Sequence, residues 1–243
     1  LESRVILALD VPASKAREFV AQTKDLVGFY KVGPVLWLEW GAECLNYLRD
    51  QGAKVMLDFK FHDIPNTVKE SLAALARAPG SEAVWGITLH AWGGFSMLRT
   101  AALERDRLAE QGHRFQLFGV TVLTSLLEKD LYRTGVNRSV EAQAKKLAAL
   151  AFDAGLDGVV ASVHEIAAIR KACGREAIVL TPGIRLAANP KRNLDQKRVA
   201  TPAEALEKGA DYLIVGRDVY QDADPRGRLG DLIGAMKTAR IIR

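Results

Sequence analysis

The sequence predicts a single (β/α)₈ barrel that spans residues 1–243 as one domain. Eight short apolar runs alternate with amphipathic, helix-like stretches from one end of the chain to the other. No Ser/Gly/Pro-rich linker divides the chain into two units. The alternative fold is an open doubly wound sheet, and its dinucleotide-binding form is disfavoured because no GxGxxG motif follows the first apolar run.

The expected strands are short and rich in Val, Ile, Leu and Ala, as is typical of strands buried on both faces of a parallel sheet. In chain order they cover residues 4–9, 29–32, 54–58, 83–89, 116–123, 158–161, 177–180 and 212–215.

The expected helices lie between and after these strands, at residues 14–26, 34–50, 65–78, 94–111, 139–154, 163–172, 202–208 and 228–240. Several carry start signals. Ser14 precedes the first helix, and Pro65 and Pro202 fall in first turns. Thr201 followed by Glu204 resembles a capping box.

Charge and composition restrict the class of partner. The net charge of +5 and the pI near 9.2 favour an anionic ligand. Because no Arg/Lys-rich run has interleaved aromatic residues, a small anion is expected rather than a nucleic acid.

Cysteine use and hydropathy indicate where the protein works. Cys44 and Cys173 lack metal-type spacing and are interpreted as reduced packing thiols, which suits the cytoplasm. No stretch approaches the roughly 18 apolar residues of a membrane span. The apolar run in residues 1–10 is interpreted as a strand and not as a signal peptide.

Polar side chains cluster where the expected strands end. The working face of such a barrel is formed by the loops after the strands, so catalytic residues are expected at these positions. The polar residues found there are Asp10, Lys31, Asp58, Lys60, His90, Thr124, Arg185 and Arg217.

The segment LDFKFHDIPNT, residues 57–67, carries the densest pattern. If the third strand continues through Lys60, the side chains of Asp58 and Lys60 share a face, because strand side chains alternate. Asp63 follows, and Lys31 ends the neighbouring strand, so two cations and two anions alternate. A purely structural ion-pair network is the alternative. It is disfavoured because four charges at a buried barrel mouth are costly to desolvate.

This segment resembles the DxKxxDxxxxT signature of the orotidine 5'-monophosphate decarboxylases of bacterial type. The match continues with ALD at 8–10, YKVG at 30–33, TVLTS at 121–125, TPGIR at 181–185 and VGR at 215–217. The resemblance implies a homodimer without metal or cofactor that converts orotidine 5'-monophosphate to uridine 5'-monophosphate and CO2, the last step of de novo uridine monophosphate synthesis.

The resemblance also implies catalytic roles. Lys60 would stabilise negative charge at C6 of the pyrimidine and protonate it. Asp58 would lie beside the scissile carboxylate, and Lys31 would bridge the aspartates. Asp63 and Thr67 would reach into the partner subunit's site, where Asp63 would support Lys60 and both would contact the ribose side.

The remaining implied contacts bind the substrate. Asp10 and Lys31 would hold the ribose hydroxyls, and Thr124 the pyrimidine edge. Gly216, Arg217 and Arg185 would bind the phosphate. The loop that begins at Arg185 is expected to be a lid, with Gln196 touching phosphate and base.

Two features depart from the family pattern. Trp92 stands where a small residue is usual, and the loop between Arg185 and Gln196 is about two residues longer than usual. His62 and His90 are interpreted as hydrogen-bonded structural residues and not as bases or metal ligands.

Two other functions remain open. One is a metal-dependent decarboxylase or aldolase for sugar phosphates, which would need an acidic residue in place of Lys31. The other is a barrel that binds nucleotides without turnover, which has no need of Lys60 between two carboxylates.

Overall fold

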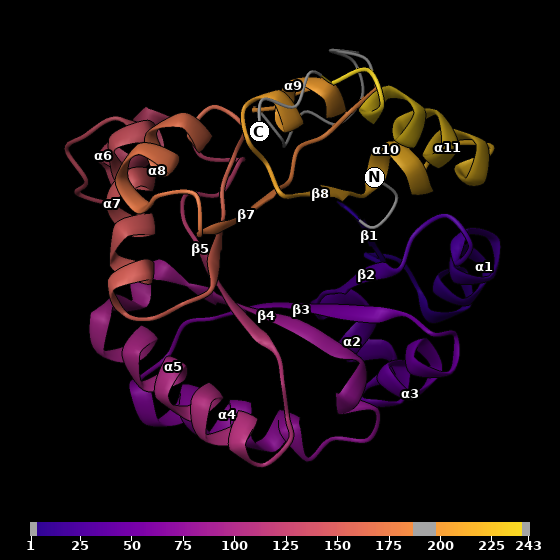
Figure 1. Cartoon of the computed structure of the whole chain (residues 1–243), viewed down its shortest axis with the longest axis horizontal. Helices are drawn as coiled ribbons and strands as arrows, with labels where there is room; N and C mark the ends of the chain where they lie inside the picture. Colours follow the sequence, from indigo (N-terminus) through magenta and orange to yellow (C-terminus); the bar gives the residue numbers. More distant parts are fainter. Residues whose placement is uncertain (1–3, 187–197, 240–243) are drawn as a thin grey trace.

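The computed structural model describes residues 4–186 and 198–239, and these ranges form the predicted closed barrel. Eight parallel strands pair in chain order, and β8 closes the ring against β1. Helices surround the strands on the outside (Figure 1). The strands are β1 (Val5–Ala8), β2 (Phe29–Val32), β3 (Lys54–Phe61), β4 (Val84–His90), β5 (Gln116–Val120), β6 (Gly158–Val160), β7 (Ile178–Thr181) and β8 (Tyr212–Val215).

The helices agree with the sequence-based expectation in most places. They are α1 (Ala13–Thr23), α2 (Pro34–Trp40), α3 (Glu43–Asp50), α4 (Pro65–Ala76), α5 (Gly94–Glu110), α6 (Glu128–Arg133), α7 (Val140–Asp153), α8 (Ile166–Cys173), α9 (Pro202–Glu207), α10 (Arg217–Tyr220) and α11 (Pro225–Met236). Short 3₁₀ turns, η2 (Ser81–Ala83) and η3 (Ala91–Gly93), flank β4.

Several helix boundaries differ from the prediction. The single helix expected at 34–50 is two, because Gly41 adopts a left-handed φ of 63° that ends α2. Ser14 does not precede α1, since the helix starts at Ala13 and Ser14 lies in its first turn. The sequence does not predict α6 and α10, which are only 6 and 4 residues long and too short for a periodic signal.

Other start signals are confirmed. Thr201 caps α9 by accepting the Glu204 backbone N–H at 3.2 Å. One further boundary differs from the prediction: α11 starts at Pro225, three residues before the expected start at 228, and Asp224 caps it by accepting the backbone N–H of Gly227.

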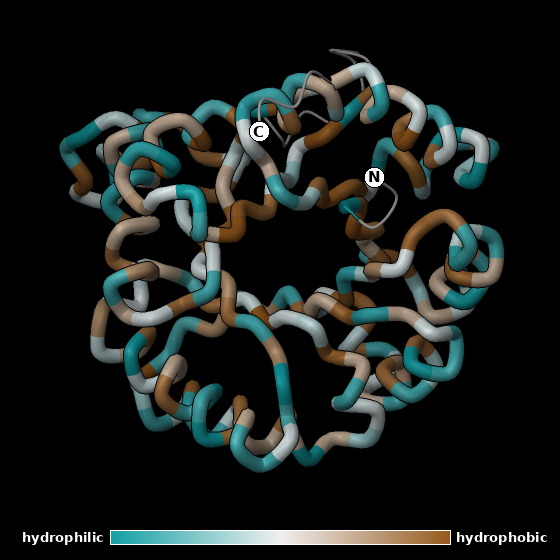
Figure 2. The backbone as a smooth tube through the Cα atoms, viewed as in Figure 1, coloured by the Kyte–Doolittle hydropathy of each residue, from teal (hydrophilic) through white to brown (hydrophobic). Residues whose placement is uncertain are grey.

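Apolar side chains form two layers. One buried cluster fills the space between the strands and the helices. A second cluster draws at least one side chain from each of the eight strands, which places it as a ring inside the barrel: Ile6, Phe29, Met56, Trp85, Phe118, Val160, Leu180 and Ile214. Figure 2 shows hydrophobic segments around the centre and hydrophilic ones chiefly on the outer helices. No helix in the described ranges is both long and apolar enough to cross a membrane.

Candidate active site

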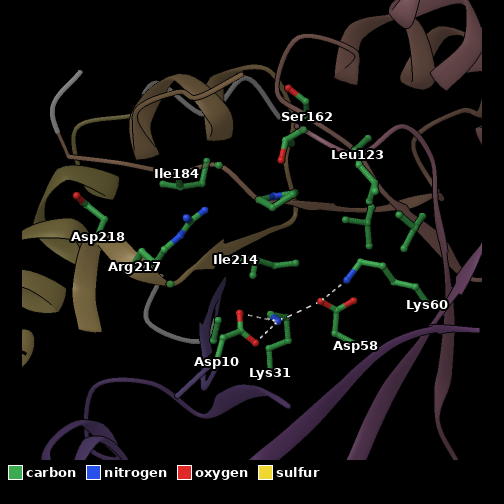
Figure 3. Close-up of a pocket in the computed structure, with 18 of the residues that line it drawn as sticks. Asp10, Lys31, Asp58, Lys60, Leu123, Ser162, Ile184, Ile214, Arg217 and Asp218 are labelled. Carbon is green, nitrogen blue, oxygen red and sulfur yellow. Dashed lines mark hydrogen bonds and ion pairs between the residues drawn. The ribbon is translucent and has the colours of Figure 1, made fainter. Parts of the chain in front are cut away.

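Charged side chains from three neighbouring strands meet at the carboxyl-terminal mouth of the barrel. The Lys31 ammonium lies 2.9 Å from Asp10 Oδ1 and 3.1 Å from Asp58 Oδ2. The Lys60 ammonium lies 2.9 Å from the same Asp58 oxygen. Figure 3 shows the resulting chain of contacts, Asp10 to Lys31 to Asp58 to Lys60. The predicted convergence of Lys31, Asp58 and Lys60 is confirmed. The fourth member of the observed network is Asp10.

The two lysines of the network differ in how far their side chains are buried. The Lys31 side chain is 9% exposed and lies enclosed between two carboxylates, whereas the Lys60 side chain is 35% exposed. Both lysines line the cavity, and the ammonium of Lys60 is the more accessible of the two to a ligand there.

Burial and ion pairing oppose each other in setting the charge of this network. Burial alone would lower the pKa of Lys31, but the charges and hydrogen bonds of Asp58 and Asp10 outweigh it and raise that pKa. Burial alone would raise the pKa of Asp58, but Lys31 and Lys60 lower it from 3.8 to about 2. At neutral pH, Lys31 is thus a cation and Asp58 an anion.

The lowered pKa of Asp58 predicts a pH-dependent stability. Because the folded-state pKa lies below the unfolded-state value, the contribution is present above about pH 4 and is lost as the pH falls toward 2. A shift of this size corresponds to about 2 kcal/mol. We expect the free energy of unfolding, measured in urea from pH 5 to 2.5, to fall further in the wild type than in Asp58→Asn. Parallel pH profiles for the two proteins would contradict this.

The third strand is distorted where it carries these residues. Leu57 pairs with Ile87 and Phe61 with Leu89, so three residues of β3 face one residue of β4. Within this bulge Lys60 has φ 50°, the only positive φ outside glycine among the described residues. Bulges next to active sites commonly redirect a side chain. The bulge, and not the predicted alternation of strand side chains, therefore brings the Lys60 side chain to Asp58.

Glycine at position 33 allows the close approach of Asp10 and Lys31. A Cβ at Gly33 would lie 2.9 Å from Asp10 Oδ1 and 3.4 Å from Lys31 Nζ. Any larger residue would displace this ion pair.

The network borders a cavity of about 300 Å³, a size at the lower end of small-ligand pockets. Its lining includes Thr124, Arg185, Gly216 and Arg217, as the sequence predicted. Figure 3 shows Arg217 across the cavity from Lys60, with Ile214 between them. The cavity therefore has the four-residue network on one side and a guanidinium on the other.

Two predicted site residues, Asp63 and Thr67, do not line this cavity, and a third lies outside the described residues. Asp63 and Thr67 are exposed and do not line it, and Asp63 Oδ1 accepts the backbone N–H of Ile64. Within one chain, the observed array of four charges thus contains Asp10 where the sequence predicted Asp63. Gln196, with most of the expected lid, lies outside the described residues.

The described residues at both ends of the expected lid segment are bonded to residues that lie beyond the carboxyl ends of strands. Leu186 donates its backbone N–H to Asp218, which also pairs with Arg228 at 2.9 Å. Arg198 pairs with the buried Glu165 and donates to the backbone carbonyls of residues 122 and 123, beside Thr124. The two ends are thereby held at the edge of the cavity.

One histidine departs from its predicted role. His90 is predicted to be hydrogen-bonded, but its buried Nδ1 has no hydrogen-bond partner among the described residues. Burial, together with His62 and Lys60, lowers the pKa of His90 from 6.5 to about 4. His90 is therefore uncharged beside Lys60. Trp92 is half-buried and packs against the core, an arrangement the sequence did not define.

Sequence reasoning missed four polar groups. Thr88 is fully buried beside Asp58, and Asp218, Tyr220 and Ser162 line the cavity. Asp218 and Tyr220 lie one and three residues after Arg217, so extending the strand-end rule by three residues would have found them. The described residues contain no group of three or more His, Cys, Asp or Glu side chains arranged for a metal ion.

Comparisons with known proteins agree with this geometry. The family model of orotidine 5'-phosphate decarboxylase / HUMPS matches residues 3–231. Orotidine 5'-phosphate decarboxylase of Carboxydothermus hydrogenoformans is 43% identical over 228 residues, which cover 93% of this chain and 92% of that protein. The enzyme of the same name from Syntrophotalea carbinolica is 40% identical over 239 residues, covering 97% and 96%.

Solved structures of similar proteins share this fold over nearly the whole chain. Orotidine 5'-phosphate decarboxylase from Lactobacillus acidophilus superposes with a TM-score of 0.79 at 31% identity, covering 97% of this chain and 100% of that chain. An uncharacterized conserved protein from Geobacillus kaustophilus reaches a TM-score of 0.80 at 32% identity, covering 96% and 99%. Because the family model covers more than nine-tenths of the sequence, the chain belongs to the orotidine 5'-phosphate decarboxylase / HUMPS family.

Proposed function

We propose that this chain decarboxylates orotidine 5'-monophosphate to uridine 5'-monophosphate and CO2, the last step of uridine monophosphate synthesis, without a metal or organic cofactor. The observation that carries the proposal is the accessible Lys60 ammonium, fixed 2.9 Å from a buried aspartate on one side of a cavity lined by Arg217.

The chemical difficulty of this reaction lies at C6 of the pyrimidine. When the bond to the carboxylate breaks, CO2 departs and an electron pair remains in the ring plane, where the π system cannot delocalise it. A positioned cation in a site of low dielectric stabilises such charge. Lys60 supplies that cation and then its proton, which forms the C6–H bond of the product. The neutral amine recovers a proton from water.

Asp58 adds a second effect. Its carboxylate is an anion beside Lys60, where the substrate carboxylate would lie. Two like charges about 4 Å apart repel by roughly 4 kcal/mol at an effective dielectric of 20. This repulsion is relieved as CO2 departs. Lys31, enclosed by Asp10 and Asp58, keeps the Asp58 carboxylate ionised and holds both carboxylates in place.

The rest of the cavity supplies binding contacts. Asp10 with Lys31 holds the ribose hydroxyls, and Thr124 bonds the pyrimidine edge. Arg217 and Arg185 bind the phosphate dianion beside Gly216, since a guanidinium matches phosphate oxygens in charge and geometry. Gln196 is expected to add a contact to phosphate and base.

The rival function is a metal-dependent reaction on sugar phosphates in the same barrel group. That reaction needs a further carboxylate where Lys31 stands. Here the Lys31 ammonium lies between Asp10 and Asp58 and would repel a divalent cation. We therefore expect turnover of orotidine 5'-monophosphate to be unchanged by a chelator. Turnover of a sugar phosphate that needs added Mg²⁺ would favour the rival. Binding of uridine 5'-monophosphate without turnover would favour the non-catalytic barrel.

The active form is proposed to be a homodimer in which Asp63 and Thr67 complete the partner's site. Both residues are exposed and lie outside their own cavity lining. The neighbouring Ile64 is 66% exposed, and a nearby apolar groove is lined by Trp37, Phe59, Phe61, Ser71, Ala74, Leu75 and Ala78. An apolar surface beside two polar residues suits a second copy of the chain.

A mixing experiment tests this arrangement. Lys60→Ala and Asp63→Asn are each expected to have little activity alone. In a mixed dimer, one site combines the intact Lys60 of one chain with the intact Asp63 of the other. After denaturation and refolding together in equal amounts, about a quarter of wild-type activity should return, because half of the dimers are mixed and each has one intact site. Activity no higher than the average of the two separate variants would argue against a shared site.

We also propose a cytoplasmic location. The two cysteines, Cys44 and Cys173, are free thiols in the structure, and Cys44 is buried in α3. Free packing thiols suit a reducing compartment.

A further inference from the structure

The hydroxyl of Thr88 joins the two residues on which the proposed reaction depends. It donates a hydrogen bond to Asp58 Oδ1 at 3.0 Å and accepts the backbone N–H of Lys60 at 2.9 Å. The carbonyl of Leu57 is a poorer acceptor at 3.4 Å, since it is farther away and uncharged. Thr88 itself is 0% exposed.

The position of Thr88 in the sheet explains these contacts. It is the single residue of β4 that faces the three bulged residues of β3. The bulge turns the N–H of Lys60 away from the normal backbone ladder, and a buried N–H without an acceptor is rare in proteins. The threonine hydroxyl provides that acceptor, so the left-handed conformation of Lys60 is held by a side chain from the next strand.

The same hydroxyl completes the coordination of Asp58. One carboxylate oxygen, Oδ2, receives both ammonium groups, from Lys31 and Lys60. The other oxygen, Oδ1, receives the Thr88 hydroxyl. The carboxylate plane is therefore fixed from both sides, and it cannot rotate without losing a contact.

We propose that Thr88 is a positioning residue for the decarboxylation: it holds the Asp58 carboxylate and the Lys60 backbone in one arrangement, so that the ammonium is aimed into the cavity. This inference rests on the function proposed above. Thr88 does not line the cavity, so it acts only through these two residues.

The test is Thr88→Val, which keeps the shape of the side chain and removes the hydroxyl. We expect kcat for orotidine 5'-monophosphate to fall by about 100-fold, because a misplacement of about 1 Å has this effect on a catalytic group. KM should stay within about threefold, since the proposed phosphate and ribose contacts lie on other strands. Thr88→Ser, which keeps the hydroxyl, should recover at least about a third of wild-type kcat.

Thr121→Val is the matched control. Thr121 is also 0% exposed, and its hydroxyl also makes a barrel hydrogen bond, to the Val160 carbonyl at 2.9 Å. It touches neither Asp58 nor Lys60 in any hydrogen bond of the described residues. A kcat of Thr88→Val equal to that of Thr121→Val would overturn the proposal, whatever the change in stability of either protein.

A second measurement separates this inference from the proposed function. Amide hydrogen exchange of the peptide that contains Lys60 needs no substrate and should be faster in Thr88→Val than in Thr121→Val. If wild-type protein does not turn over orotidine 5'-monophosphate, the proposed function fails, and unchanged exchange would overturn the positioning role separately. If Thr88→Val does not fold, Thr88→Cys, a weak hydrogen-bonding group, is compared with Thr88→Ser, and equal kcat values would overturn the proposal.

Discussion

Lys60→Ala is expected to lower kcat for orotidine 5'-monophosphate by at least about 10⁴-fold. The loss combines two contributions: proton donation by a positioned acid, typically about 10²–10⁴-fold, and electrostatic stabilisation by a preorganised donor, about 10²–10³-fold. Binding should change far less, because Arg217 and Asp10 lie elsewhere in the cavity lining. Steady-state kinetics together with calorimetric binding of uridine 5'-monophosphate would measure both effects.

The matched control is Lys208→Ala. Lys208 is a half-exposed lysine that also forms an ion pair, with its Nζ 3.3 Å from Glu204 Oε1. It lies outside the cavity lining. It should keep wild-type kinetics. Lys60→Arg separates charge from position, since it keeps the cation but changes its shape; we expect it to remain at least about 100-fold impaired. The expected loss of about 10⁴-fold leaves about a ten-thousandth of wild-type kcat. If Lys60→Ala kept more than about a hundredth of it, another group would have to be the acid.

Arg217→Ala is expected to lower kcat/KM for orotidine 5'-monophosphate by about 10²–10³-fold. Removing one partner of a largely desolvated charge pair costs about 3–4 kcal/mol, and each 1.4 kcal/mol is a factor of ten. The truncated substrate orotidine, which lacks the phosphate, gives a direct control. Wild type and Arg217→Ala should process orotidine with the same kcat/KM.

A second control variant changes the net charge of the protein by the same amount as Arg217→Ala does. Arg226 pairs with Asp25 at 2.7 Å on the surface, away from the cavity lining, so Arg226→Ala should behave as wild type. An equal loss for orotidine and its 5'-monophosphate in Arg217→Ala would contradict a role in phosphate binding, because it would show that the arginine acts on the reacting centre instead.

The barrel and the location of its site could be predicted because both follow from local patterns. Buried parallel strands are continuous apolar runs, and the polar residue that ends each run falls at the working face. This rule, applied to the sequence alone, places Asp10, Lys31 and Asp58 at one edge of the barrel. The ion pairs that join them confirm it.

What could not be predicted depends on contacts between distant segments. The left-handed backbone of Lys60 and the hydroxyl of Thr88 are linked only across a shifted strand register, which no period in the sequence reveals. The short helix α10 and the bond from Leu186 to Asp218 likewise depend on how β7 and β8 lie side by side. Asp63 and Thr67 are exposed in a single chain, so their proposed role depends on a second copy.

The most direct measurement is the stoichiometry of CO2 and uridine 5'-monophosphate formed from orotidine 5'-monophosphate by chelator-treated protein. Loss of substrate absorbance in the ultraviolet gives the rate, and trapped CO2 gives the yield. We expect rapid turnover with one CO2 for each uridine 5'-monophosphate, undiminished by the chelator. Folded wild-type protein that forms no product, or forms it only after Mg²⁺ is restored, would contradict the proposed reaction.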